Sequence, residues 1–364
     1  MIAGGGTAGH VVPALAIGRA LVARGHPPES LHFVGSERGI ERRLVPEAGF
    51  ALTLLPGRGI QRRLTTDNVS ALWGLGEAFG RAFAVLRRRR PRVVVAMGGY
   101  ASVPCAMAAA ALRVPIVVHE QNAVPGAANR AVGRFARASA ISFPGTRLPR
   151  ARLTGNPVRP EVLAVDRTSG RDGARRTLGL PLDRRVLAVF GGSLGALRLN
   201  RAVLDALPAW APRTDLAIHH VVGERDWELV TTSAPALAVG GLDYRPVRYE
   251  DRMPLVLAAA DLFVCRAGAT TVSELAAVGV PAVLVPLPGA PGDHQTANAR
   301  VFEKAGAAVL VPDGALDGKR LVTEVDRLLG APEALDAMAR AAAGLARRDA
   351  ADRVAALVEE HAGG

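Results

Sequence analysis

Ala3-Gly4-Gly5-Gly6-Thr7-Ala8-Gly9-His10 is a glycine-rich turn that leads directly into an apolar, helix-forming segment, residues 11–22. Glycine lets the backbone adopt positive φ and lets a ligand approach without obstruction by a Cβ atom. A helix that begins just after such a turn presents unpaired N–H groups at its start. We therefore expect a ligand-binding loop here, with His10 at the start of the helix and facing the ligand.

The spacing Gly4-x-Gly6-x-x-Gly9 also matches the glycine pattern of dinucleotide-binding folds. That pattern requires an acidic residue about 20 residues further on, at the end of the second strand. The second strand is predicted at 31–34, so Glu29 comes before it and Glu37 well after it. A nicotinamide-dependent oxidoreductase is therefore a minor alternative.

Length and composition indicate a globular protein of two domains. The chain has 364 residues, more than one ordinary core accommodates, and 49% of them are hydrophobic. No apolar run reaches the roughly 18 residues of a membrane-spanning helix, and no signal peptide is expected before the glycine turn. Cys105 and Cys265 lie in different halves, which favours reduced core cysteines and a cytoplasmic location. The short first strand leaves open a start upstream of Met1.

The net charge of +12 permits an anionic partner, but the pattern of residues does not favour nucleic acid. The basic residues are almost all arginine, and aromatic residues make up 4% of the chain without alternating with the arginines. Platforms on which nucleic-acid bases could stack are therefore not expected. No nucleic-acid partner is predicted.

The first half alternates short β-rich runs with helical patterns. Strands are predicted at 1–3, 31–34, 51–55, 93–97 and 116–119. Strands that alternate with helices predict an α/β fold with a parallel, doubly wound sheet that binds ligands beyond the carboxyl ends of its strands. Three loops fall at such ends, at residues 4–10, 97–100 and 119–122.

The second half repeats this plan. A buried strand at 185–190 is followed by Gly191-Gly-Ser-Leu-Gly-Ala196 and a helix, and the segment 265–285 echoes the segment 98–118. Two similar α/β domains in tandem are therefore predicted, joined near Thr154-Gly-Asn-Pro-Val-Arg-Pro160. The boundaries are placed at 1–157 for the first domain and 158–340 for the second, with 341–364 as a C-terminal helix that packs across both.

Two Rossmann-like domains whose glycine loops face each other across a cleft are the architecture of GT-B glycosyltransferases. Seven motifs, in order along nearly the whole chain, resemble the MurG family of that fold: Gly-Gly-Thr-Ala-Gly-His10, Met-Gly-Gly-Tyr100, His119-Glu-Gln-Asn122, Gly155-Asn-Pro-Val-Arg159, Gly-Gly-Ser193-x-Gly-Ala, Cys-Arg266-x-Gly-Ala-x-Thr-Val-Ser-Glu274 and Asp293-His-Gln295-x-x-Asn-Ala. Leu194 stands where the family commonly has glutamine, and Ala267 where it often has serine. The resemblance implies an N-terminal acceptor domain and a C-terminal UDP-GlcNAc domain.

In the expected reaction, a sugar hydroxyl attacks the anomeric carbon and UDP leaves. The negative charge that develops on the leaving pyrophosphate must be stabilised. Backbone N–H groups of 191–196 and 268–271 are suited to this, together with the hydroxyl of Ser193. Glu274 is predicted to accept from the ribose hydroxyls, or else to complement the helix dipole. With the contacts that the resemblance implies, the expected donor site comprises Thr7, Ala8, Gly9, Asn122, Arg159, Ser193, Arg266, Ala269, Thr270, Thr271, Val272, Ser273, Glu274 and Gln295.

Removal of the acceptor proton requires a base, and His10 is the first candidate because an ordinary imidazole pKa near 6.5 leaves the ring largely neutral at cytoplasmic pH. Glu120 is the second candidate, and Tyr100 is a possible positioning group. From the residues alone, His10 is equally suited to donate a hydrogen bond to a phosphate or to the loop. His119, His219 and His220 are expected to be structural.

A separate segment, 69–86, carries apolar residues at helical spacing and is followed by four arginines, 87–90. Most of its apolar residues are expected to pack on the sheet, while its basic end suits an anionic lipid surface. The residues predicted to contact the membrane are Leu72, Trp73, Phe79, Phe83, Arg87 and Arg88.

The sequence and the resemblance together predict an inverting N-acetylglucosaminyltransferase at the cytoplasmic face of the cell membrane. Its partners would be UDP-GlcNAc, undecaprenyl-pyrophosphoryl-MurNAc-pentapeptide (lipid I) and the anionic membrane surface, and its product lipid II for peptidoglycan. No cofactor and no metal are expected, since the sequence has no Asp-x-Asp pair suited to a divalent ion. The alternatives are a GT-B enzyme for another lipid or small acceptor, and a nucleotide-binding or scaffold module.

Overall fold

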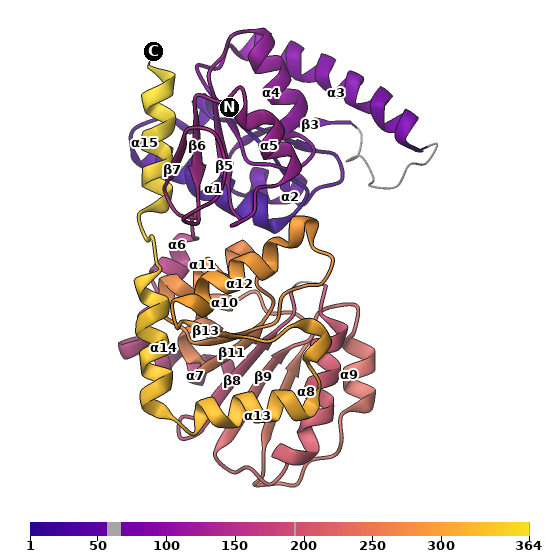
Figure 1. Ribbon diagram of the computed structural model, residues 1–364, viewed down its shortest axis with the longest axis vertical. Coiled ribbons are helices and arrows are strands. Elements are labelled where there is room, and N and C mark those ends of the chain that lie inside the picture. Colours follow the sequence, from indigo (N-terminus) through magenta and orange to yellow (C-terminus); the bar gives the residue numbers. More distant parts are fainter. Residues whose placement is uncertain (57–66, 193, 364) are drawn as a thin grey trace. The chain divides into compact units, whose positions relative to one another are not determined.

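The computed structural model describes residues 1–56, 67–192 and 194–363, with side chains in helix α3 (Asp67–Arg89) from residue 74 onward (Figure 1). The chain forms two compact units. Met1–Arg159 and Arg347–Gly364 make up the first domain, and Pro160–Ala346 makes up the second. The C-terminal segment that the sequence analysis set apart, 341–364, is thus divided between the two at residue 347.

The first domain contains a parallel sheet of seven strands in the order β3-β2-β1-β4-β5-β6-β7. The strands are β1 (Ile2–Ala3), β2 (His32–Ser36), β3 (Ala51–Leu55), β4 (Val94–Ala96), β5 (Ile116–Glu120), β6 (Ala138–Ile141) and β7 (Ala151–Leu153). The chain builds outward in one direction from β1 and in the other from β4. The loops that follow these two strands therefore lie at the switch point, where doubly wound sheets bind ligands.

Helices cover this sheet with their apolar faces. They are α1 (Ala8–Ala23), α2 (Glu41–Glu47), α3, α4 (Ser102–Ala111), α5 (Ala127–Gly133) and the C-terminal α15 (Ala350–Ala362), with a 3₁₀ turn at Pro28–Ser30. Val11 and Ile17 of α1 share one buried cluster with Val354 and Val358 of α15. The end of the chain therefore completes the core of the first domain, where α15 packs against β5 and β6 (Figure 1).

The second domain repeats the plan with a parallel sheet of six strands in the order β10-β9-β8-β11-β12-β13. The strands are β8 (Arg185–Phe190), β9 (Leu216–Val221), β10 (Asp243–Val247), β11 (Leu262–Cys265), β12 (Ala282–Leu284) and β13 (Ala308–Leu310). Its switch point lies between β8 and β11. The glycine loop 191–196 follows the first of these strands, and the loop that begins at Arg266 follows the second.

The helices of the second domain begin and end at recognisable signals. Asp166 caps α7 by accepting from the backbone N–H of Thr168 at 2.8 Å, and Gly179 ends it in the left-handed conformation. The helices are α6 (Pro160–Leu163), α7 (Arg167–Leu178), α8 (Leu197–Trp210), α9 (Trp227–Ser233), α10 (Met253–Ala259), α11 (Ala269–Val278), α12 (His294–Lys304), α13 (Gly318–Leu329) and α14 (Pro332–Gly344), with 3₁₀ turns at Pro291–Asp293 and Asp313–Ala315.

The predicted architecture of two doubly wound parallel domains is confirmed. The strands predicted in the first half correspond to β1 to β5, each within two residues at either end. The sequence analysis missed β6 and β7. Their sequences, Ala-Ser-Ala-Ile and Ala-Arg-Leu, contain few β-branched residues and no clear alternation, so the sheet extends over residues of weak strand propensity.

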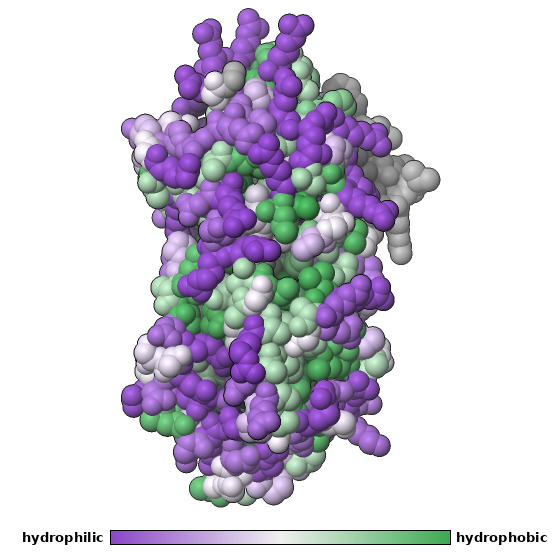
Figure 2. All heavy atoms as spheres, turned by 60° about the vertical axis from the view of Figure 1, so that its left-hand side comes forward, coloured by the Kyte–Doolittle hydropathy of each residue, from purple (hydrophilic) through white to green (hydrophobic). Residues whose placement is uncertain are grey.

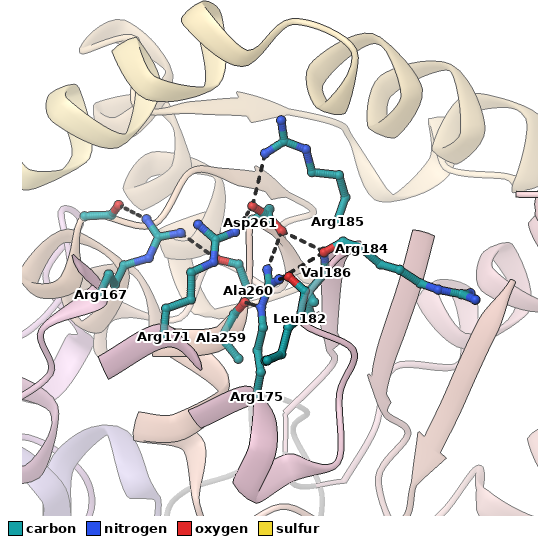
Figure 3. A network of polar contacts seen from close by, with 11 residues as sticks. Arg167, Arg171, Arg175, Leu182, Arg184, Arg185, Val186, Ala259, Ala260 and Asp261 are labelled. Atoms are coloured by element: carbon teal, nitrogen blue, oxygen red, sulfur yellow. Dashed lines mark hydrogen bonds and ion pairs between the residues drawn. The ribbon is translucent and has the colours of Figure 1, made fainter. Parts of the chain in front are cut away.

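An ion cluster joins α7 to the start of β11 (Figure 3). The Asp261 carboxylate is 3% exposed and accepts from the backbone N–H of Val186 at 2.7 Å, from Arg175 at 2.8 Å and from Arg171. Burial alone would raise the pKa of Asp261, but the Val186 N–H and the two guanidinium groups outweigh it and hold that pKa below its ordinary value. Arg175, itself buried, also donates to the carbonyl groups of three residues.

The surface is rich in polar groups. Figure 2 shows hydrophilic side chains, in purple, over most of one face, with hydrophobic residues in several areas between them. Among the residues that the structure describes, none of the helices combines the length and the apolar character needed to cross a bilayer.

The Asp261 cluster yields a stability prediction. Asp261→Ala should lower the free energy of unfolding of the second domain by about 3–5 kcal/mol, because the buried Arg175 guanidinium loses its carboxylate. Urea unfolding followed by the fluorescence of the buried Trp210 measures this change. Asp251→Ala is the control, since this exposed carboxylate lies 3.9 Å from Arg252 and its loss should change stability by less than about 0.5 kcal/mol. Equal effects of the two substitutions would contradict the prediction.

Candidate functional site

The two loops at the switch point of the first domain pack against each other without intervening side chains. A Cβ atom at Gly99, which has φ +77°, would lie 2.5 Å from the Gly5 carbonyl oxygen, and one at Gly4 would lie 2.6 Å from Met97 Cβ. Both distances are shorter than van der Waals contact, so a larger residue at either position would force the loops apart. The loop after β1 and the loop after β4 therefore form one closely packed surface.

His10 lies on this surface in the first turn of α1. Its Nδ1 is 3.1 Å from the Thr7 hydroxyl, and a Cβ atom at Gly98 would lie 3.1 Å from its Nε2. The ring is half-buried, with Gly98 beneath it, while Thr7 and Ala8 are exposed. The predicted loop thus brings a histidine, a hydroxyl and the start of a helix together.

Glu120, the second candidate base, has a different environment. Its carboxylate is buried and accepts four hydrogen bonds: from the backbone and side-chain nitrogens of Asn122 at 2.9 and 3.3 Å, from the Gly126 N–H at 3.0 Å and from Asn129 Nδ2 at 2.9 Å. These bonds occupy both of its oxygens. The geometry fits a residue that fixes the turn 121–126, and with it the position of Asn122.

Tyr100 lies beside the glycine loops, and its hydroxyl is directed at backbone carbonyl groups. The oxygen lies 3.0 Å from the Pro56 carbonyl oxygen and 3.1 Å from that of Gly74 in α3. Burial, with a smaller contribution from Glu77, raises the pKa of Tyr100, so the hydroxyl stays protonated and donates. Tyr100 thus connects the site loop to the end of β3 and to α3.

A buried polar layer supports these loops from below. Gln121 Nε2 donates to the Met97 carbonyl oxygen at 2.9 Å and to His119 Nδ1 at 3.0 Å, and His119 Nε2 faces the Gly155 carbonyl oxygen at 3.4 Å. Burial lowers the pKa of His119 to about 4, so the ring is neutral near pH 7. His119 therefore belongs to the scaffold, in agreement with the structural role expected for it.

The second domain has a similar arrangement at its own switch point. In the loop after β8, a Cβ atom at Gly191 would lie 2.6 Å from Ala196 Cβ, and Gly195 packs against Gly223. Ser193 lies outside the described residues. The loop thus turns tightly enough to bring backbone N–H groups close to a ligand.

The other loop of this switch point enters α11. Gly268 is the N-cap and supplies no side-chain hydrogen bond, and the first turn of α11 contains no acidic residue. The N–H groups of Ala269, Thr270 and Thr271 therefore begin a helix whose own first turn has no carboxylate to complement its N-terminal dipole. Val272 and Glu274 are buried, whereas Thr270, Thr271 and Ser273 are half-buried. The Thr270 hydroxyl is buried and has no hydrogen-bond partner among the described residues.

Two amide side chains of α12 form hydrogen bonds to the loop that enters α11. Gln295 Oε1 accepts from the N–H groups of Ala267 at 3.2 Å and Leu287 at 2.9 Å, and Asn298 Nδ2 donates to the Ala267 carbonyl oxygen at 3.1 Å. Both polar groups of the Ala267 backbone are thereby fixed. The Gln295 Nε2 group has no hydrogen bond within the described part of the chain, which leaves a donor for a ligand.

Arg266 is fixed within the protein. Its guanidinium donates to Asp313 at 2.6 Å and to the carbonyl oxygens of Val285 and Pro286, both at 3.1 Å. Its side chain is only 11% exposed. These contacts tie the end of β11 to the loop after β12 and to the 3₁₀ turn at Asp313, so Arg266 supports the shape of the loop.

A chain of hydrogen bonds lies beneath the loop after β8. Asn200 Nδ2 donates to Asp226 at 2.9 Å and to the Val222 carbonyl oxygen at 3.1 Å, so its Oδ1 accepts from His220 Nε2 at 3.0 Å. His220 Nδ1 then accepts from the Tyr244 hydroxyl at 2.9 Å. Burial lowers the pKa of His220 to about 3, which keeps the ring neutral, as this pattern requires.

The remaining predicted residues are distributed as follows. Arg159 is half-buried and is the last residue of the first part of the first domain. Phe79 and Phe83 are half-buried against the core cluster of the first domain, with ring centroids 6.0 Å apart, while Arg87 and Arg88 are exposed at the end of α3. The side chains of Leu72 and Trp73 lie outside the described residues.

The sequence analysis missed two residues that shape these loops, Glu41 and Asn200, and it quoted a third, Asn298, in a motif without giving it a role. Asn200 and Asn298 are fully buried, and Glu41 is 1% exposed. A polar residue on the buried face of an amphipathic helix is the signal that could have identified them. Within the part of the chain that the structure describes, no group of three or more His, Cys, Asp or Glu side chains is arranged to hold a metal ion.

Two doubly wound parallel domains, each with a pair of glycine loops at its switch point, define the GT-B fold of glycosyltransferases. The glycosyltransferase family 28 N-terminal domain matches residues 1–141, and the C-terminal domain of the same family matches residues 186–354. In fold, the chain is similar to the solved structure of Acinetobacter baumannii MurG, with a TM-score of 0.79 and 28% identity over 99% of both chains.

Among curated relatives, the UDP-N-acetylglucosamine–N-acetylmuramyl-(pentapeptide) pyrophosphoryl-undecaprenol N-acetylglucosamine transferase of Nocardioides sp. is 45% identical, over 99% of this chain and 97% of that protein. The protein of the same name from Acidothermus cellulolyticus is 43% identical, over 100% and 97%. The chain therefore belongs to glycosyltransferase family 28 and, within it, to the family of these N-acetylglucosamine transferases.

Proposed function

We propose that this chain transfers N-acetylglucosamine from UDP-GlcNAc to undecaprenyl-pyrophosphoryl-MurNAc-pentapeptide, with inversion at the anomeric carbon, and so forms lipid II for peptidoglycan. The observation that carries the proposal is 40–45% identity, over nearly the whole chain, to relatives that bear this name. The glycine loops of the second domain would cradle a nucleotide diphosphate, and those of the first domain would hold a base beside the acceptor.

The second domain (placed at 158–340 in the sequence analysis) would bind the donor. The N–H groups of residues 269–271 at the start of α11, where the N-cap is a glycine, and those of the loop 191–196 would donate to the pyrophosphate, because helix N-termini and glycine turns favour negative charge. Thr270 has a buried hydroxyl without a partner among the described residues, which supports a role in binding. Gln295 would donate its Nε2 hydrogens to the sugar, and Glu274 would accept from the ribose.

The first domain (placed at 1–157) would bind the acceptor and remove its proton. His10 is the proposed base, because its ring lies at the surface of the two glycine loops, whereas Glu120 already accepts four N–H groups. Glu120 would instead position Asn122. Thr7 would orient the His10 ring through Nδ1.

The first domain would also contact the membrane, which would place the protein peripherally at the cytoplasmic face of the cell membrane. Phe79 and Phe83 pack on the core, so the contact would come mainly from the basic end of α3, where Arg87 and Arg88 are exposed. Each arginine near an anionic surface contributes up to roughly 1 kcal/mol. Anionic lipid would hold the enzyme where its lipid-linked acceptor is found.

The reaction itself is tested by UDP release. The protein should release UDP from UDP-GlcNAc when a lipid I analogue is added, and at most slowly without it. Turnover should persist in EDTA, because backbone N–H groups rather than a divalent ion would meet the leaving charge. A coupled assay for UDP measures both. Turnover with diacylglycerol but not with the lipid I analogue would contradict the proposed acceptor, and loss of activity in EDTA that magnesium restores would contradict the proposed leaving-group chemistry.

The base is tested by two substitutions. His10→Ala should reduce kcat by about 10²–10⁴, the usual contribution of a positioned base, with little change in the KM for UDP-GlcNAc. His10→Gln should lose a similar amount, because an amide can donate a hydrogen bond but cannot take the proton. If His10→Gln keeps nearly wild-type kcat and the acid limb of the kcat–pH profile, the base is another residue and His10 only positions the loop.

Membrane contact is tested by co-sedimentation with vesicles of phosphatidylglycerol and phosphatidylcholine. Replacing Arg87 and Arg88 together by glutamine should weaken binding by about tenfold or more at low salt. The charge-matched control replaces two exposed arginines of the second domain, Arg176 and Arg201, and should bind like the wild type. Equal losses in both double variants would mean that net charge, and not the end of α3, determines binding.

A further inference from the structure

Glu41, in the first turn of α2, places a carboxylate beneath the first glycine loop. The residue is 1% exposed. Its Oε2 accepts from the Gly6 N–H at 2.9 Å and its Oε1 from the Ser36 N–H at 2.7 Å. One carboxylate thus connects the loop after β1 to the end of β2, and each of its oxygens holds a different backbone N–H.

Three glycines enclose this carboxylate. A Cβ atom at Gly5, Gly35 or Gly39 would overlap the Glu41 side chain. Gly5 and Gly35 do not have positive φ, so they are required there for space and not for backbone conformation. We call these three residues the glycine collar. The collar leaves just enough space for the Glu41 side chain. An acidic residue in an ordinary surface turn has no such enclosure.

The contacts of Glu41 continue to His10. Glu41 holds the Gly6 N–H, and the adjacent Gly5 carbonyl packs against Gly99. Gly98, the neighbour of Gly99, lies against the His10 ring, and Thr7, the neighbour of Gly6, is within hydrogen-bond distance of the same ring. Both sides of the His10 ring therefore depend on the loop that Glu41 holds.

We propose that Glu41 is a positioning residue that acts through the first glycine loop to place His10 for proton removal. The inference rests on the proposed function for its kinetic part and on the geometry alone for its structural part. A carboxylate is required because two N–H donors face its two oxygens. A glutamine would offer one acceptor and would turn an NH₂ group toward the other N–H.

The test compares Glu41→Gln with Glu47→Gln. Glu47 lies on the same short helix but is exposed and pairs with Arg43 across one turn, so its substitution removes the same charge without touching the loop. Glu41→Gln should lower kcat about 10²-fold, the usual cost of displacing a catalytic group by about 1 Å. The thermal stabilisation by UDP should stay unchanged, because the proposed contacts to the pyrophosphate and the ribose lie in the second domain.

Hydrogen–deuterium exchange gives a readout that does not depend on turnover. The peptide that contains Gly6 should exchange faster in Glu41→Gln than in the wild type, and at the wild-type rate in Glu47→Gln. If Glu41→Gln does not fold, Gly39→Ala places a methyl group against the carboxylate and should produce the same two changes to a smaller degree.

The outcomes separate this inference from the proposed function. Unchanged kcat and unchanged exchange in Glu41→Gln overturn the inference whatever the wild type does. Faster exchange with unchanged kcat overturns the positioning role and leaves Glu41 as a structural brace. If the wild type releases no UDP with the lipid I analogue, the proposed function fails, and the exchange experiment still decides whether Glu41 holds the loop.

Discussion

The close approach of two backbones at the switch point of the first domain is the constraint on which the site depends. Gly4 and Gly5 after β1 pack against Gly98 and Gly99 after β4 with no side chain between them. Such contact is possible because glycine has no Cβ atom, and it places Gly98 directly against the His10 ring. Helix α1, whose apolar face is buried in the core, carries His10 in its first turn and so joins this loop to the core.

In the second domain, side-chain amides hold the loops at the switch point. Gln295 and Asn298, one turn apart on α12, bind the N–H and the carbonyl oxygen of Ala267 and so fix the loop that enters α11. Beneath the loop after β8, Asn200 donates to the Val222 carbonyl oxygen and accepts from His220, whose other ring nitrogen bonds to Tyr244. Burying an amide costs free energy unless its donors and acceptor find hydrogen-bond partners. An arrangement of the loop that satisfies them is therefore favoured over the others.

Much of this could be predicted from the sequence. Alternating strands and helices predicted both doubly wound sheets, and the glycine motifs predicted the four loops that the structure places at the switch points. The environments of single residues could not be predicted in the same way. The Arg266 guanidinium pairs with Asp313, which is distant in sequence, and the Glu120 carboxylate is surrounded by donors of the turn that follows it, such as Asn129, which meet only once that turn has folded.

The sequence analysis gave Glu41 no role because its position in the sequence is an ordinary one. An acidic residue at the start of a helix is common, because it complements the helix dipole and needs no further explanation. Its distinguishing feature is the glycine collar, whose members are separated in the chain and meet only when α2 folds against β1 and β2. Phe79 and Phe83 illustrate the opposite case, in which helical spacing alone could not separate a lipid-facing stripe from one that packs on the core.

The Tyr100 hydroxyl has one proton and two carbonyl oxygens within reach, at 3.0 and 3.1 Å. A phenol donates that proton to one acceptor at a time, so Tyr100 can bond either to the end of β3 or to α3, and rotation about a single C–O bond exchanges the two. The helix that carries the arginine run is therefore joined to the loop beside His10 through an exchangeable bond. The fold can release this link and form it again without breaking any strand or helix.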